Sequence, residues 1–250
     1  MRASDRAYVT LREEIVDGDL LPGALLGEVE QSMRLGISRT PLREALSRLI
    51  ADGLAEPSRG RGIVVSAVSL DAAPHLFDLR LALETLAARR AAERAAEPHD
   101  GAALRESFAT LAIRFDEATA DLAAGVDPTD YYTLTAELDA ALDTACGNPY
   151  LADSLAGLRL HLGRLRRLAR HSPDRLAASA QEHAAIARAI ALGDPDLAAA
   201  TTTVHLRRAL AHLRGPGEDR AAAPPTADPI STPITAPTPT STSTTQESAS

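Results

Sequence analysis

The sequence of 250 residues lacks features that mark several classes of protein. It has one cysteine, Cys146, so no internal disulfide can form, and it has no lysine, so all 26 basic residues are arginine. No apolar run approaches the ~20 residues that a transmembrane helix needs. The N-terminal segment MRASDRAYVTLREEI contains no apolar core of a signal peptide. We therefore expect a cytoplasmic protein without disulfides.

Aromatic side chains are also scarce, at 3% of the sequence, although apolar residues make up 45%. Alanine and leucine supply much of the apolar content, and both favour helices, whereas strands favour β-branched and aromatic residues. The composition therefore predicts a mainly α fold. A chain of this length has room for two domains.

The net charge of −8 at first argues against a nucleic-acid partner, but the charge is unevenly distributed. Residues 1–70 hold nine arginines and ten acidic residues, and within 34–61 six arginines face only three acidic residues. The remaining 180 residues carry a net charge of −7. This asymmetry is typical of a small DNA-binding domain joined to an acidic body, although a basic segment is also common on an ordinary solvated surface.

The stretch GISRTPLREALSRL, residues 36–49, predicts an amphipathic helix. Thr40 is a good N-cap with Pro41 in the first helical position, Ser38 is a competing N-cap, and Gly53 ends the helix. The apolar residues recur at the spacing of one buried helix face, namely Leu42, Ala45, Leu46, Leu49 and Ile50.

The segments around this helix complete a recognisable order of elements. Helices are predicted over 8–17 and 26–34 because glycines follow both, and two short strands, LAEPS and GIVVSAV, flank the turn SRGRG. A helix, a helix-turn-helix and a hairpin in this order predict a winged helix-turn-helix.

From residue 72 onward the pattern is helical, and cap and breaker residues punctuate it. Six amphipathic helices with short connections predict an antiparallel all-α bundle. Their expected ranges are 72–97, 101–124, 128–145, 149–170, 174–192 and 195–213. Residues 221–250 contain eight threonines, six prolines and five serines, so we expect them to be disordered. The predicted organisation is a winged domain at 1–68, a linker at 69–74, a helical effector-binding and dimerisation domain at 75–214 and a disordered tail at 215–250.

Residues 8–65 closely resemble the N-terminal domain of the GntR family of bacterial transcription regulators. The resemblance runs without a gap. It rests on Leu11-Arg12, Gly18, Leu20, Pro22-Gly23, Leu26, Glu28, Leu35-Gly36, the block from Ser38 to Leu46, Arg48-Leu49, Gly53-Leu54 and Arg59-Gly60.

This resemblance, together with the chemistry of the residues, assigns a DNA-contacting set. An α-helix fits the major groove, an arginine near its start can contact guanine with two hydrogen bonds, and hydroxyls and free N–H groups there can hold phosphate. The expected DNA-binding residues are Ser38, Arg39, Thr40, Arg43, Arg59 and Gly60. The alternative for Arg43 and Arg48 is a solvated helix flank.

The helical half resembles, more loosely, the FadR-like subfamily with a C-terminal FCD-type effector domain. The matching pieces are Asp78-Leu79-Arg80 with Leu83-Glu84, CGNPYL at 146–151, EHAAIARAI at 182–190 and His205. The resemblance implies a bundle that binds a small effector and forms dimers. It also makes Arg80 the candidate anchor for an effector carboxylate, with an ion pair to Glu84 as the alternative.

Two histidines are placed symmetrically about a turn. Residues 183 and 205 are equally distant along the sequence from Asp194, which lies in the turn Gly193-Asp194-Pro195. Two antiparallel helices joined there bring His183 and His205 to the same height. If they share a face, they can bind one ligand together.

The resemblance also implies a possible metal site. In metal-binding relatives a third histidine, with an aspartate four residues before it, completes the site on another helix; here Asp139 stands at the histidine position and Thr135 at the aspartate position. One interpretation is that Asp139, His183 and His205 bind Zn²⁺, Ni²⁺ or Mn²⁺. The other is that the metal site has been lost and the histidines hydrogen-bond the effector or one another. The expected effector-binding residues are Arg80, Asp139, His183 and His205.

The sequence thus predicts a ligand-responsive transcription regulator rather than an enzyme. We expect a homodimer on a palindromic double-stranded operator, with DNA affinity set by a small effector, for which the resemblance implies an organic acid. The alternatives are a metal-dependent enzyme or metal-binding helical module that uses Asp139, His183 and His205, and a helical protein–protein module with the winged domain as scaffold. The absence of a second carboxylate or nucleophile motif disfavours the enzyme, and the pair Arg39 and Arg43 disfavours the scaffold.

Overall fold

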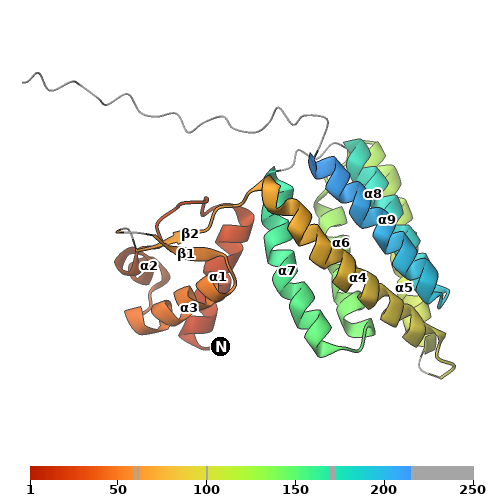
Figure 1. Cartoon of the computed structure of the whole chain (residues 1–250), viewed down its shortest axis with the longest axis horizontal. Coiled ribbons are helices and arrows are strands. Elements are labelled where there is room, and N and C mark those ends of the chain that lie inside the picture. The colour runs from red at the N-terminus through yellow and green to blue at the C-terminus, as the bar shows by residue number, and fades with distance from the viewer. Residues whose placement is uncertain (59, 61, 100, 169–172, 215–250) are drawn as a thin grey trace, which may run out of the picture. The chain divides into compact units, whose positions relative to one another are not determined.

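The fold is mainly α, with one small hairpin after three N-terminal helices (Figure 1). It is described from a computed structural model that covers residues 1–58, 60, 62–99, 101–168 and 173–214. Arg59 and the whole predicted tail at 215–250 lie outside the described residues.

The N-terminal part is built from helices α1 (Ala3–Asp17), α2 (Glu28–Leu35) and α3 (Arg39–Ala51) and strands β1 (Ala55–Ser58) and β2 (Gly62–Val65). The two strands are antiparallel and pair Ala55 with Val65 and Ser58 with Gly62. A single bridge from Leu25 to Val64 attaches the segment before α2 to this hairpin. The predicted winged helix-turn-helix order is therefore present.

Helix α3 begins at Arg39, so the predicted Thr40 N-cap is wrong and the competing position, Ser38, is the N-cap. Pro41 still lies in the first turn, where its missing N–H leaves no hydrogen bond unmade. The Ser38 side chain makes no capping hydrogen bond among the described residues. The helix therefore starts with an open end whose backbone N–H groups face outward.

The apolar face of α3 forms the centre of the N-terminal core. Leu42, Ala45, Leu46 and Leu49 are fully buried, as their spacing predicts, whereas Ile50 is half-buried. They pack with buried residues of the neighbouring elements, including Ala7, Tyr8, Leu11, Ile15, Leu26, Leu54 and Val65. Because Ala7 and Tyr8 join this core, α1 starts at Ala3, five residues before its predicted start.

The C-terminal part is a bundle of helices joined by short turns. After a short 3₁₀ helix at Leu70–Ala72, which the sequence did not predict, the helices are α4 (Ala73–Ala96), α5 (Gly101–Ala123), α6 (Thr129–Ala145), α7 (Pro149–Leu168), α8 (Pro173–Ala191) and α9 (Pro195–Arg214). Their limits agree with the predicted ranges to within two residues. Cap chemistry explains the agreement, because the side chains of Asp127, Asn148 and Asp194 accept hydrogen bonds from the first backbone N–H groups of α6, α7 and α9.

Small side chains let these helices lie close together. Helix α5 packs along α8, and α4 packs along α9 (Figure 1). Buried alanines on α4 and α8 line much of the contact, and the large side chains of Phe108 and Phe115 fill the remaining space. This close packing holds the side chains described next on five separate helices around one cavity.

Candidate DNA-contacting surface and effector cavity

The first turn of α3 presents a polar and basic surface. Ser38, Arg39 and Thr40 are all exposed, and the Arg43 side chain is 63% exposed. No acidic residue lies in this first turn, so the positive end of the helix dipole is not neutralised there. The arrangement can hold phosphate on backbone N–H groups while the arginine side chains reach outward.

Arg43 makes an ion pair with Glu28 at the start of α2. Its Nε donates to both carboxylate oxygens at 2.9 Å, and its Nη2 lies 2.8 Å from Oε2. The hydrogen bond raises the pKa of Arg43 and lowers the pKa of Glu28. Because the pair is exposed, it is weak enough for a phosphate or a base edge to displace the carboxylate.

Two other predicted positions have different surroundings, namely Gly60 at the tip of the wing and Arg48 near the end of α3. Gly60 is exposed with a φ of +74°, and no atom outside residues 59–61 lies within 4 Å of the position that a Cβ would take. A close approach to a DNA backbone is therefore unobstructed at the tip of the wing. Arg48 instead binds α1, through Asp5 at 2.9 Å and the ring face of Tyr8 at 3.9 Å.

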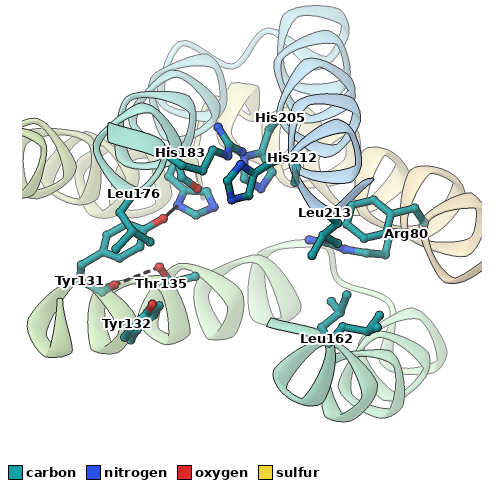
Figure 2. A pocket seen from close by; sticks show the side chains of 15 residues that line it. Arg80, Tyr131, Tyr132, Thr135, Leu162, Leu176, His183, His205, His212 and Leu213 are labelled. Carbon is teal, nitrogen blue, oxygen red and sulfur yellow. Dashed lines mark hydrogen bonds between the residues drawn. The ribbon is translucent and has the colours of Figure 1, made fainter. Parts of the chain in front are cut away.

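A cavity of about 80 Å³ opens inside the helical part (Figure 2). Side chains from five helices form its wall. They are Phe77 and Arg80 of α4, Tyr131, Tyr132 and Thr135 of α6, Leu162 and Leu165 of α7, Arg175, Leu176, Ser179 and His183 of α8, and His205, Ala209, His212 and Leu213 of α9.

His183 and His205 lie side by side in this wall, as their equal distance from Asp194 predicts. Their ring centroids are 4.5 Å apart, and both side chains are buried. His183 also packs against Phe115 and has its Nδ1 3.3 Å from the hydroxyl of Tyr131. Figure 2 shows His183 and His205 projecting from α8 and α9 toward the same space.

Glu182 determines the state of His205. Its Oε2 lies 2.8 Å from His205 Nδ1, and Arg175 donates two hydrogen bonds to its carboxylate at 3.0 and 3.1 Å. Burial alone would raise the pKa of Glu182, but the hydrogen bonds from His205 and Arg175 outweigh it and lower the pKa to about 2. Burial lowers the pKa of His205, so the ring is neutral at pH 7.

These two states fix which nitrogen of His205 meets a ligand. An ionised carboxylate only accepts hydrogen bonds, so the neutral ring carries its proton on Nδ1 and donates it to Glu182. Nε2 then has a free lone pair.

Sequence reasoning did not assign a role to Glu182, Arg175 or Tyr131. Glu182 precedes His183 in the helix, but nothing in the spacing shows that it bonds to a histidine of another helix.

Arg80 makes the ion pair that is the alternative to an effector anchor, and it also lines the cavity. Its Nε donates to Glu84 Oε1 at 2.6 Å and its Nη2 lies 3.3 Å from Oε2, so the ion pair is present. The residue is only 5% exposed, lines the cavity and has its guanidinium 4.7 Å from the ring centre of Phe77. Burial opposes ionisation of Glu84, but the Arg80 charge outweighs it and lowers the pKa of that carboxyl.

Thr135 and Asp139 have different surroundings, although both lie on α6. The Thr135 hydroxyl lines the cavity and donates to the backbone oxygen of Tyr131 at 2.9 Å. Asp139 lies in a smaller neighbouring hollow of about 30 Å³, where its Oδ2 is 3.3 Å from Nε of Arg159. Arg159 in turn binds Asp143 at 2.5 Å. Both hollows include Arg80, His183 and His205.

Comparison with known proteins identifies the two parts of the chain. The profile of the FCD domain matches residues 75–208, and the profile of the bacterial regulatory proteins of the gntR family matches residues 3–65. This chain belongs to the GntR family. Members with this pair of domains are transcription regulators, so the protein binds DNA and is not an enzyme.

Individual relatives agree with this assignment of the GntR-family chain. An HTH-type transcriptional regulator in an unstable DNA locus of Streptomyces ambofaciens is 30% identical over 200 residues, which is 80% of each chain. The structure of E. coli McbR/YncC matches 86% of this chain and 98% of its own, with a TM-score of 0.67 and 19% identity. A GntR regulator of Rhodococcus sp. RHA1 matches 85% of this chain and 98% of its own, with a TM-score of 0.62 and 23% identity. The two solved structures support the fold alone.

Some FCD domains bind a metal ion, which makes the fit of the predicted ligands a specific question. No group of three or more histidine, cysteine or acidic side chains within the described ranges is arranged to hold a metal ion. His183 and His205 are close together, but Asp139 pairs with Arg159 instead of completing a set with them. The described residues therefore do not fit a three-ligand metal site.

Among the helices that the structure describes, none has the length and apolar character needed to span a membrane.

Proposed function

We propose that this GntR-family regulator binds an inverted-repeat operator as a homodimer and that a small carboxylate in the effector cavity changes its affinity for DNA. We place this activity in the cytoplasm. The observation that carries the proposal is the convergence of Arg80, His183 and His205 on one cavity inside the FCD domain.

The polar groups of the cavity match a carboxylic acid. The ion pair with Glu84 uses Nε and Nη2 of Arg80, so Nη1 is the amino group left to donate to a ligand oxygen. Nε2 of His205 can accept a hydrogen bond from a hydroxyl of the same ligand. Apolar side chains such as Phe77, Leu162 and Leu176 form the rest of the wall. A volume of about 80 Å³ favours a compact ligand of a few heavy atoms.

The DNA-contacting set follows from the exposed first turn of α3. Ser38 and Thr40, with the open N-terminus of the helix, would hold phosphates, while Arg39 and Arg43 read base edges in the major groove. Arg59, which lies outside the described residues, and Gly60 would follow the backbone from the wing. One recognition helix covers about half of a typical site, which supports a dimer on two half-sites.

A divalent ion is the competing occupant of the effector cavity. It is favoured by the bond between His205 and Glu182, because metal-binding histidines usually donate their second N–H to a carboxylate. It is disfavoured because two histidines are fewer ligands than the three or more that Zn²⁺ sites have. Metal analysis of the purified protein separates the two occupants. A stoichiometric Zn²⁺, Ni²⁺ or Mn²⁺ that is lost in His183→Ala would replace the carboxylate as the primary ligand.

The DNA-binding proposal predicts a loss of affinity in Arg43→Ala. Operator sequences are selected from randomised DNA, and their affinity is measured by fluorescence anisotropy at fixed salt. If Arg43 contacts a base, Arg43→Ala should bind the selected operator roughly 5- to 150-fold more weakly. Arg114→Ala is the matched control, because Arg114 lies on α5 in a similar exposed ion pair, with Glu137.

Two results of this experiment would contradict the proposal. Wild-type affinity in Arg43→Ala would remove Arg43 from the contact set. Selected sequences without an inverted repeat would contradict the dimeric mode of binding.

A further inference from the structure

A second hollow lies where residues 66–72 connect the hairpin to the bundle, apart from the effector cavity. Its volume is about 290 Å³, and it is open to solvent on one side. Val68, Leu76 and Leu79 give it apolar walls, while His75, His161 and Arg164 provide polar groups. We call this hollow the junction cleft. The junction cleft and the effector cavity share only the side chain of Leu165 among their described lining residues.

Arg164 is a buried cation at this cleft. It is only 5% exposed, its Nη1 donates to the hydroxyl of Ser66 at 2.9 Å, and its Nη2 donates to the backbone oxygen of the same residue. Both acceptors are neutral. Burial lowers the pKa of Arg164, and no acidic side chain among the described residues offsets this effect.

Three arginines of the bundle with largely buried side chains behave differently. Each has a carboxylate partner within hydrogen-bond distance, namely Arg80 with Glu84, Arg159 with Asp143 and Arg175 with Glu182. A buried charge without a counter-charge is costly, and folded proteins normally pair it. Arg80 and Arg164 are the two described arginines that are only 5% exposed, and of these Arg164 has no carboxylate partner within the described part of the chain and lines the junction cleft.

The neighbouring groups leave this charge uncompensated. His161 lies beside Gly53, and burial followed by the Arg164 charge lowers the pKa of its ring, so it is neutral at pH 7. The carboxylate whose charge acts on this histidine, Asp52, accepts a hydrogen bond of 2.5 Å from the hydroxyl of Tyr8. An anion that enters the cleft would thus meet a cation that lacks a carboxylate partner among the described residues.

We propose that the junction cleft is a second ligand site that binds a small organic anion. The carboxylate of the ligand pairs with the guanidinium of Arg164, and its short apolar body packs against Val68, Leu76 and Leu79. A carboxylate fits better than inorganic phosphate, because most of the remaining wall is apolar and would leave extra phosphate oxygens without donors. The ligand would contact both the segment that follows the hairpin and the helices of the FCD domain.

Butanoate is a suitable probe, with acetate and inorganic phosphate for comparison. Binding is measured on the full chain by titration calorimetry and by the shift of the Val68 amide signal in NMR spectra. We expect butanoate to shift this signal and to bind more tightly than phosphate. Arg164→Met should weaken this binding about ten- to hundredfold, because it removes charged hydrogen bonds.

A second variant protects the test against a general effect of Arg164 on the fold. Leu79 is 54% exposed on the wall of the cleft, and Leu79→Glu provides a carboxylate of the chain's own that competes for Arg164. Leu86→Glu is the matched control, because Leu86 lies on the same helix, is 42% exposed and does not line the cleft. Leu79→Glu should lose butanoate binding, and Leu86→Glu should keep it.

The effector cavity requires its own control. Arg80→Lys alters the effector cavity without touching the junction cleft, so it should keep the Val68 response to butanoate. The proposal is overturned if wild type shows no response at millimolar butanoate, if Leu79→Glu binds like wild type, or if Arg80→Lys abolishes the response.

Discussion

At the scale of single residues, the protonation of His205 decides what the effector cavity offers to a ligand. Neutral His205 donates to Glu182 and exposes the Nε2 lone pair, whereas a protonated ring would present an N–H donor and a second charge beside Arg80. The two forms would select different ligands. The cost of changing from one to the other is measurable as the pH dependence of stability.

We predict that the protein loses stability as the pH falls below about 6.5. Burial lowers the pKa of His205 in the folded state, so the unfolded chain takes up a proton near its ordinary pKa of about 6.5 before the folded chain does. The free energy of unfolding therefore decreases with falling pH from this point. Urea unfolding between pH 8 and pH 5, roughly the range over which histidine titrates, measures the slope.

Matched histidine variants assign this slope. His205→Gln should reduce it and leave the part that comes from His161, whose pKa burial also lowers, whereas His99→Gln, which alters an exposed histidine, serves as the control. Glu182 gives a separate signal. Its pKa is lowered to about 2, so its contribution disappears only below about pH 4.5, the usual pKa of glutamate. An equal slope in His205→Gln and wild type would contradict the neutral assignment.

Single residues also show where sequence reasoning about the site succeeds and where it ends. The His183–His205 pair is predictable because two helices joined by one short turn have a fixed relation. The partners Arg175, Glu182 and Tyr131 are not, because their contacts depend on the rotation of several helices against one another. The assignment of effector and DNA contacts to individual residues remains a prediction.

At the scale of elements, the turn after α3 shows how a glycine fixes the course of the chain. Gly53 has a φ of +69°, which side-chain-bearing residues rarely adopt, and a Cβ there would lie 3.3 Å from Cε1 of His161. We predict that Gly53→Ala lowers the free energy of unfolding by about 1–2 kcal/mol. Chemical denaturation monitored by circular dichroism measures this change.

Gly157 provides the control for this substitution. It lies within α7, and no atom would come within 4 Å of its added Cβ. Gly157→Ala should therefore stabilise the protein, by about 0.5–1 kcal/mol, because alanine favours helix over glycine. If both alanine variants change stability in the same direction, the strained turn at Gly53 does not explain the result.

Elements are predictable where their ends carry their own chemistry. Helices α6 to α9 begin at aspartate, asparagine or proline signals, so their limits agree closely with the predictions. The ends of α1 and α3 agree less well. Ala3 extends α1 because tertiary packing buries Ala7 and Tyr8, and α3 starts at Arg39 although Pro41, a residue common at the first helical position, favours Thr40 as the N-cap.

At the scale of the whole molecule, helix α7 touches both functions. Leu162 and Leu165 line the effector cavity, while Arg164 on the same helix holds Ser66 directly after strand β2. A ligand that shifts α7 would therefore shift the hydrogen bonds from Arg164 to Ser66 and, through them, the segment that follows strand β2 of the winged domain. The division into domains, the dimer and the tail beyond residue 214 remain predictions, since they depend on partners or on segments outside the described residues.

Thermodynamic linkage provides the last prediction, because a coupling between two sites must be reciprocal. If a carboxylic acid changes operator affinity by a given factor, the operator must change the affinity for that acid by the same factor, typically about 5- to 150-fold. Acids that raise the melting temperature are selected first. Operator affinity is then measured with and without the acid, and acid affinity with and without the operator.

Arg80→Lys tests whether this coupling passes through the effector cavity. The substitution keeps the positive charge beside Glu84 but removes Nη1, the amino group left to donate to a ligand carboxylate. It should bind the operator like wild type without acid and should lose most of the response to acid. Because linkage requires equal factors for two coupled binding sites, unequal factors in the two directions would show that a further equilibrium contributes to the measured affinities. A full response in Arg80→Lys would move the effector site away from Arg80, and a response lost in Leu79→Glu instead would place it in the junction cleft.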